Sequence, residues 1–135
     1  MPPRDRLETY LAAMTAPDSV EEEYAPDAQF FAVIVELRAQ AARDDDYRDH
    51  FDRSDRVFEA FLERALREAA ADYEAESDDD AGEIPPAEVA STLQTLATGG
   101  MLRWATTADR GWVDGTRRGA RRYLETVLPR IDADA

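Results

Sequence analysis

His50, the only histidine of this 135-residue chain, is a candidate for metal binding or acid–base catalysis. Asp46 precedes His50 by four residues, so the two side chains share one face of a helix and have the spacing of a metal-binding pair. Two ligands without a third at a readable spacing make a weak metal site, and His50 has no visible partner for acid–base catalysis. A surface histidine is the simpler interpretation.

The segment SDDDAGEIPPAE, residues 77–88, partly matches a calcium-binding loop. Asp79, Gly82 and Glu88 occupy the third, sixth and twelfth positions of such a loop. Ser77 and Ala81 stand where further ligands are expected, and the paired prolines distort the segment. We therefore expect an acidic loop without bound metal.

The segment RRGARR, residues 117–122, places four arginines together and raises the question of phosphate contacts. The whole chain carries 30 acidic and 16 basic residues, a net charge of −14, and all 16 basic residues are arginine. Such a surface repels nucleic acid and anionic membranes. We expect a solvated helix face here, and no direct binding of nucleic acid.

The charge is unevenly distributed along the chain. Residues 1–100 carry nine arginines and 25 acidic residues, a net charge of −16, whereas residues 101–135 carry seven and five, a net charge of +2. The acidic composition resembles that of proteins from salt-loving microbes, with an acidic partner-binding surface as the competing account.

Several classes of function are disfavoured by what the sequence lacks. The chain has no cysteine, no glycine-rich phosphate loop and no paired nucleophile and base, so we expect neither an enzyme nor a cofactor. No apolar run approaches the length of a membrane span, and the first residues lack the apolar core of a signal peptide. A cytoplasmic location follows as an expectation.

Helical periodicity runs through almost the whole sequence. It predicts one all-α domain over residues 1–135, a bundle of five helices. Their expected ranges are residues 4–15, 28–43, 46–74, 86–107 and 112–129. Asp27 is a plausible N-cap of the second helix, and Pro86 suits the first turn of the fourth. The second helix contains FFAVIVEL, which is apolar nearly all round and predicts a central position.

The predicted fourth helix contains two adjacent glycines, Gly99 and Gly100, which should each weaken a helix. The run from Val89 to Leu102 holds 14 consecutive uncharged residues. One face of this helix is expected to pack against the core. A second face carries small, uncharged residues and needs another surface to cover it. A close helix–helix approach at Gly99 would offset the lost helix propensity, while a kink within a monomer is the alternative.

These faces predict a two-fold dimer, in which the last two helices of each chain form an intermolecular four-helix bundle. The interface is expected to take the outer face of the fourth helix and the apolar stripe of the fifth. Its predicted residues are Thr92, Thr95, Gly99, Leu102, Thr106, Val113, Thr116, Ala120, Tyr123, Leu124 and Val127.

Two long segments resemble the C-terminal regulatory domain of the tetracycline-repressor (TetR) type of transcriptional regulator. They are ELRAQAARDDDYRDHFDRSDRVFEAFLERALREA, residues 36–69, and PPAEVASTLQTLATGGMLRWATTADRGWVDGTRRGARRYLETVL, residues 85–128. The resemblance lies in the pattern of residue types. Small residues precede an aspartate-rich stretch, the fourth helix has a glycine near its end, and the last helix closes with aliphatic residues. The DNA-reading helix-turn-helix head of that family is not expected in this chain, whose first helix looks like the one that follows the head.

The resemblance implies a homodimer and a pocket for a small, mostly apolar effector between helices. The residues expected to line the pocket are Phe30, Phe31, Ile34, Phe58, Phe61, Leu62, Leu96, Met101 and Trp104. At helical spacing such residues also suit an ordinary core. The alternative is therefore a structural helical homodimer with a filled core, without ligand or catalytic activity.

Overall fold

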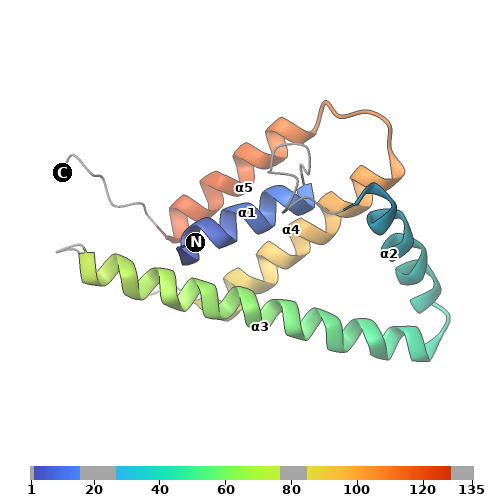
Figure 1. The fold of residues 1–135 in the computed structure, drawn as a ribbon, viewed down its shortest axis with the longest axis horizontal. Coiled ribbons are helices and arrows are strands. Elements are labelled where there is room, and N and C mark those ends of the chain that lie inside the picture. Colours follow the sequence, from blue (N-terminus) through green and yellow to red (C-terminus); the bar gives the residue numbers. More distant parts are fainter. Residues whose placement is uncertain (1, 16–26, 77–84, 129–135) are drawn as a thin grey trace.

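The computed structural model describes residues 2–15, 27–76 and 85–128, and within these ranges the chain forms five helices and no strand. They are α1 (Pro3–Thr15), α2 (Ala28–Ala41), α3 (Asp45–Glu76), α4 (Pro86–Thr106) and α5 (Val113–Val127) (Figure 1). The predicted all-α class and the five predicted helices are confirmed. α4 runs without interruption through Gly99 and Gly100, so the paired glycines do not end the helix.

The corner between α2 and α3 is fixed by local hydrogen bonds. Asp27 caps α2, as predicted, and its side chain accepts a hydrogen bond from the backbone N–H of Gln29 at 2.9 Å. At the other end of α2, the guanidinium of Arg48 donates to the carbonyl oxygens of Ala41 (3.1 Å) and Ala42 (2.8 Å). The α3 side chain of Arg48 therefore closes the C-terminus of α2.

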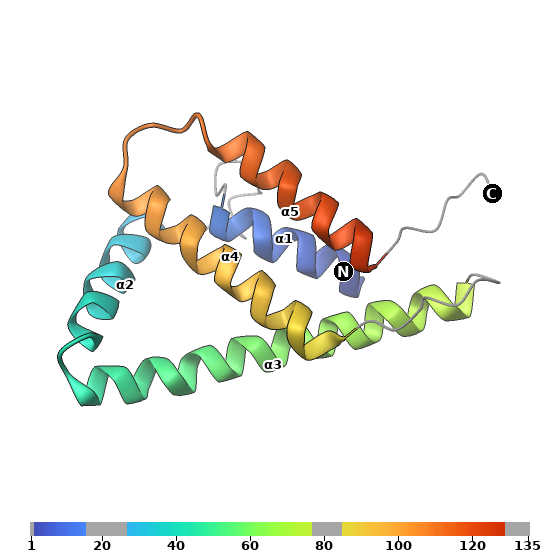
Figure 2. The ribbon, with the colours of Figure 1, turned by 180° about the vertical axis from the view of Figure 1, so that it is seen from behind.

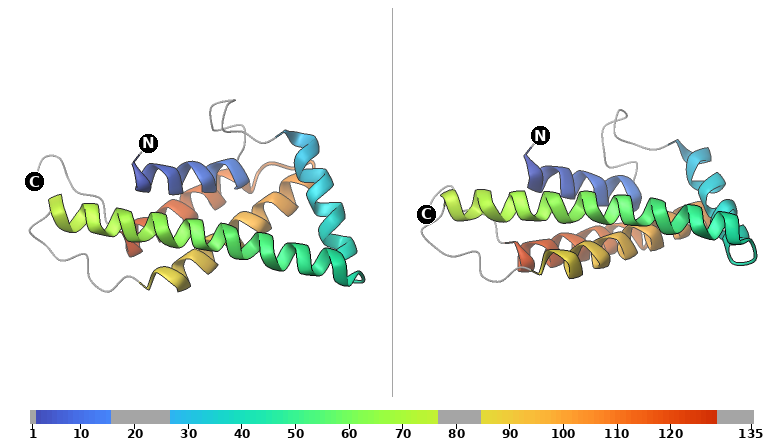
Figure 3. Two further views of the ribbon diagram at one scale, coloured as in Figure 1. Left: turned by 60° about the horizontal axis from the view of Figure 1, so that its bottom comes forward. Right: turned by 90° about the horizontal axis from the view of Figure 1, so that it is seen from below.

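The helices form a bundle with α2 standing across one end. α3 spans the length of the molecule, α1 and α5 lie side by side, and α4 crosses from α3 towards α2 (Figures 1 and 2). Among the described helices, α2 packs only against α3 and α4, and α5 only against α1 and α4 (Figure 3). None of the helices described here has the length and apolar character that crossing a membrane requires.

One hydrophobic core joins α1, α3, α4 and α5. Its side chains are almost entirely removed from solvent, and burial of apolar surface is the main force that stabilises such a bundle. The core cluster consists of Leu7, Leu11, Leu62, Ala65, Leu66, Val89, Ala90, Leu93, Ala120 and Leu124.

The prediction that the second helix is central was wrong. Phe30 and Val33 on α2 are each 51% exposed, and α2 supplies no residue to the core cluster. Its apolar sequence covers the end of the bundle, where only one side of the helix has neighbours. The helix at the centre is α4, which packs against all four others and has buried residues from Val89 to Met101.

Candidate functional site

Three buried apolar side chains outside the core cluster come from α2, α3 and α4, helices that contact one another. Phe31 comes from α2, Phe51 from the first turns of α3 and Met101 from the last turns of α4. We call these three residues the α2-end group. The region between them and the core cluster is called the junction, and it contains the polar side chains described next.

An ion pair joins α2 to α3 at the junction. Arg38 contacts Asp55 through Nη2–Oδ1 at 2.5 Å and Nη1–Oδ2 at 3.4 Å. The guanidinium also lies over the ring of Phe51, with Cζ 4.5 Å from the ring centroid. The Nε–H of Arg38 is buried and has no hydrogen-bond partner among the described residues.

Tyr10 of α1 lies beside this ion pair. Its ring packs against the edge of the core cluster and 6.4 Å, centroid to centroid, from the ring of Phe58. Burial raises the pKa of Tyr10 to about 12, helped by the negative charge of Asp55 and opposed by the positive charge of Arg38. The phenol is therefore neutral at physiological pH.

Gln94 of α4 is a further polar side chain that the fold removes from solvent. It follows Leu93 of the core cluster and precedes Met101 of the α2-end group by seven residues, two helical turns along one flank of α4. Only 7% of Gln94 is exposed, and it is the one polar residue in the buried class in the described part of the chain. Its Oε1 has no hydrogen-bond partner there.

The residues predicted to line a pocket divide into three sets in the structure. Phe31 and Met101 are buried in the α2-end group, whereas Leu62 is part of the core cluster. Ile34 and Trp104 are partly buried. The exposed set is Phe30, Phe58, Phe61 and Leu96.

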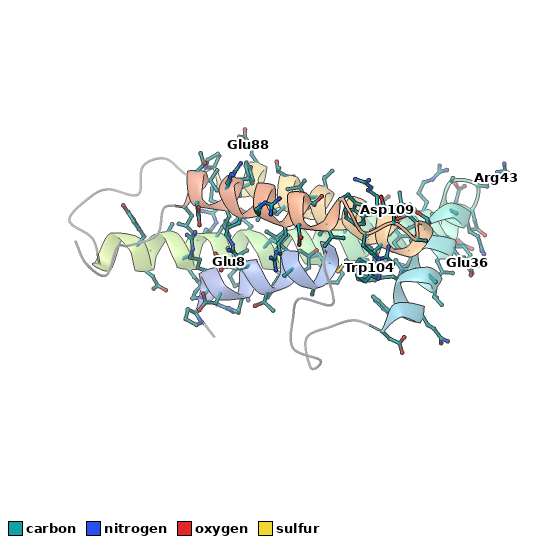
Figure 4. The ribbon with its side chains drawn as sticks, turned by 90° about the horizontal axis from the view of Figure 1, so that it is seen from above. Glu8, Glu36, Arg43, Glu88, Trp104 and Asp109 are labelled. Atoms are coloured by element: carbon teal, nitrogen blue, oxygen red, sulfur yellow. The ribbon has the colours of Figure 1, made fainter. Side chains whose placement is uncertain are left out.

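Trp104 is held by the corner that follows α4. The guanidinium of Arg110 lies 3.8 Å from the centroid of the Trp104 ring, and that of Arg103 lies 4.5 Å from the centroid of the Trp112 ring. The indole Nε1–H of Trp112 donates to the carbonyl oxygen of Asp109 at 2.9 Å. Figure 4 shows Trp104 and Asp109 towards the α2 end of the bundle, away from Glu8 and Glu88.

Sequence reasoning did not select Tyr10, Arg38, Asp55 or Gln94. One signal was available: Asp55 occupies the apolar stripe of α3, four residues after Phe51 and three before Phe58. Gln94 is the one amide within the uncharged run of α4. A charged or amide side chain at a core-facing position needs an ion-pair or hydrogen-bond partner, so such a residue is a candidate for a functional site.

The predicted dimer-interface residues behave differently on the two helices. All five on α4 are exposed on one face, and a Cβ added at Gly99 would meet no atom of the protomer within 4 Å. On α5, Ala120 and Leu124 are buried in the core cluster, with Tyr123 and Val127 packed against it and Val113 and Thr116 partly buried. The outward face of α5 instead presents Gly115 and Gly119, where an added Cβ also meets open space.

The arginine segment and the histidine pair lie on the surface. Arg118, Arg121 and Arg122 are exposed. Asp46 and His50 line a shallow hollow of about 360 Å³ with Leu37 and Tyr47. Among the described residues, no cluster of three or more possible metal ligands occurs. Most of the calcium-loop segment, residues 77–84, lies outside the described residues.

A comparison with known families identifies this fold. The family model that describes the C-terminal domain of BetI-type transcriptional repressors matches residues 3–129. The chain belongs to this family of TetR-type regulators. No curated protein and no solved structure gives a significant match. BetI-type C-terminal domains have a regulatory role, in effector binding and dimerisation, and are in general not catalytic.

Proposed function

We propose that this chain is the effector-sensing and dimerisation domain of a TetR-type regulator. A small, mostly apolar effector binds at the junction, and the outer face of α4 packs against a second copy of the chain. The observation that carries this proposal is the family match over residues 3–129. In this proposal, DNA reading belongs to a helix-turn-helix head and not to this regulatory domain.

The dimer part is supported by the face of α4 that the protomer leaves uncovered. Thr92, Thr95, Gly99 and Thr106 are small and uncharged, and Leu102 is 49% exposed beside them. Small residues let two helix backbones approach closely. Because the stripe of α5 is used within the protomer, we place α4 at the centre of the interface, flanked by Gly115 and Gly119 of α5.

The substitution Gly99→Leu tests this interface. Gly99 is exposed and a Cβ added there meets no atom of its own protomer within 4 Å, so the fold of the monomer should be retained. Across a packed interface the extra methylene groups should weaken dimerisation about tenfold or more, because overpacking costs about 1–3 kcal/mol. Light scattering of wild type and variant over a range of concentrations measures this.

The matched control is Ala60→Leu, which adds a leucine at an exposed position of α3 outside the proposed interface. It should dimerise like wild type. A wild-type chain that is monomeric at every concentration would overturn the dimer, and a dimer equally strong in Gly99→Leu would place the interface elsewhere.

The effector part is supported by aromatic and polar groups of α1, α2 and α3 that contact one another. Tyr10 packs near Phe58, and Arg38 contacts Asp55 and the ring of Phe51. Naphthalene, a small flat hydrocarbon, is a suitable first probe because Phe31, Phe51 and Met101 offer apolar contacts. Equilibrium dialysis should show that wild type retains it and that Met101→Asp, which puts a carboxylate among these contacts, does not. Absence of binding to wild type would contradict an apolar effector site.

A further inference from the structure

The buried amide of Gln94 lacks a hydrogen-bond donor in the part of the chain that the structure describes. Its Oε1 is removed from water and accepts no hydrogen bond from these residues. A buried acceptor without a donor destabilises a protein by its full desolvation penalty, and an apolar side chain of the same shape would avoid that penalty. An amide at this position therefore destabilises the fold unless another group donates a hydrogen bond to it.

The place of Gln94 within the fold indicates what that donor is. It lies on α4, where the buried residues near it along the helix, Leu93 and Met101, offer no polar side chain. α4 contacts α1, α2 and α3, the helices that carry Tyr10, Arg38 and Asp55. The proposed function places the effector between these helices, so a group on the effector is the natural donor to Oε1.

The charges at the junction decide the ionisation state of that effector. Arg38 and Asp55 neutralise each other through two contacts, and burial keeps the phenol of Tyr10 protonated. An ionised ligand would lose its hydration without meeting an uncompensated opposite charge, which is strongly unfavourable. A neutral ligand loses far less hydration.

We propose that the effector is an uncharged aromatic alcohol or a similar flat, neutral molecule, and that its O–H or N–H group donates a hydrogen bond to Oε1 of Gln94. The proposal rests on the proposed function, because it names the class of ligand for the same site. The ring of the ligand lies against Phe31, Phe51 and Met101. Gln94 thus acts as the residue that determines specificity.

Four naphthyl probes of similar shape separate the possibilities. They are 2-naphthol, which is neutral and donates a hydrogen bond, naphthalene, which has no polar group, 2-naphthoate, which is an anion, and 2-naphthylmethylammonium, which is a cation. Equilibrium dialysis at neutral pH with the full chain should rank 2-naphthol first. We expect its affinity to exceed that of naphthalene by about tenfold, or about 1.4 kcal/mol, for one hydrogen bond.

The substitution Gln94→Met tests the assigned residue. It should reduce the affinity for 2-naphthol to that for naphthalene, leave the affinity for naphthalene unchanged and raise the thermal midpoint of the ligand-free protein. The rise in stability distinguishes a ligand-binding amide from one that merely supports the fold. The control Gln40→Met, at an exposed position of α2, should leave every affinity as in wild type.

Each contrary outcome has one meaning. Equal binding of 2-naphthol by wild type and Gln94→Met, or tighter binding of the anion or the cation, would overturn the role of Gln94 and leave the effector site standing. A lower thermal midpoint of Gln94→Met would assign the amide to the fold. Binding of none of the four probes would overturn this inference together with the apolar effector site.

Discussion

Tyr10 gives the chain a specific dependence on alkaline pH. The folded protein raises the pKa of this phenol from 10.0 to about 12, so the folded chain holds the proton more tightly than the unfolded chain does. The contribution to stability is fully present below pH 10 and is lost as the pH rises from 10 to about 12. Its size is at most about 3 kcal/mol.

The substitution Tyr10→Phe should remove this alkaline loss. Chemical denaturation at several pH values above neutrality measures the free energy of unfolding, and the variant should lose less stability than wild type across this window. Tyr73→Phe, at a half-buried position near the end of α3, is the control. A parallel decline in wild type and Tyr10→Phe would contradict the burial of this phenol.

The sequence predicted the apolar residues of the site better than its polar ones. Phe31 and Met101 follow from helical spacing, because the period of a helix fixes which side chains face its neighbours. The pair of Arg38 and Asp55 does not, since the two residues are 17 apart in the chain and meet only through the crossing of α2 and α3. Spacing along one helix carries no information about such a crossing.

At the level of helices, ends were more predictable than positions. Asp27 and Pro86 favour a helix start through the backbone of their neighbours in sequence. The starts of α2 and α4 could therefore be predicted from the local sequence. The place of α2 could not, because an apolar helix suits both the centre of a bundle and its end. The helical period of α5 predicted which side chains share its apolar face. It did not predict that this face packs against the core of its own protomer.

The attachment of α2 to α3 depends on Arg48. Replacing it by alanine removes two hydrogen bonds to the last carbonyl groups of α2 and should destabilise the protein by about 1 kcal/mol. The backbone amides of α2 should exchange with solvent faster, since α2 has packing partners only in α3 and α4 among the described helices. Hydrogen exchange measures this helix by helix.

The control for this prediction is Arg53→Ala, an exposed arginine on the same helix. It should change the exchange of α2 amides little. Equal protection of α2 in wild type and Arg48→Ala would show that the side-chain hydrogen bonds do not hold the corner together.

For the molecule as a whole, the net charge of −14 predicts stability that rises with salt. Repulsion among the acidic residues is spread over residues 1–100, and salt screens it, with a Debye length of about 10 Å at 0.1 M and about 3 Å at 1 M. The thermal midpoint should therefore increase with KCl concentration over this range. Differential scanning calorimetry follows it directly.

A charge-reduced variant gives the matching comparison. Asp49→Asn with Asp52→Asn removes two exposed negative charges from α3 and should raise the midpoint at low salt while flattening its dependence on KCl. An identical salt dependence in both proteins would attribute the effect of salt to hydration or ion binding elsewhere.

The corner after α4 also makes this protein optically simple. The chain has two tryptophans, Trp104 and Trp112, and both lie in this corner under arginine guanidinium groups. All indole fluorescence of the chain therefore originates in this corner, and Figure 4 shows Trp104 towards the α2 end of the bundle. Its intensity and wavelength report the local environment there without any attached dye, and unfolding confined to the opposite end of the molecule leaves the emission unchanged.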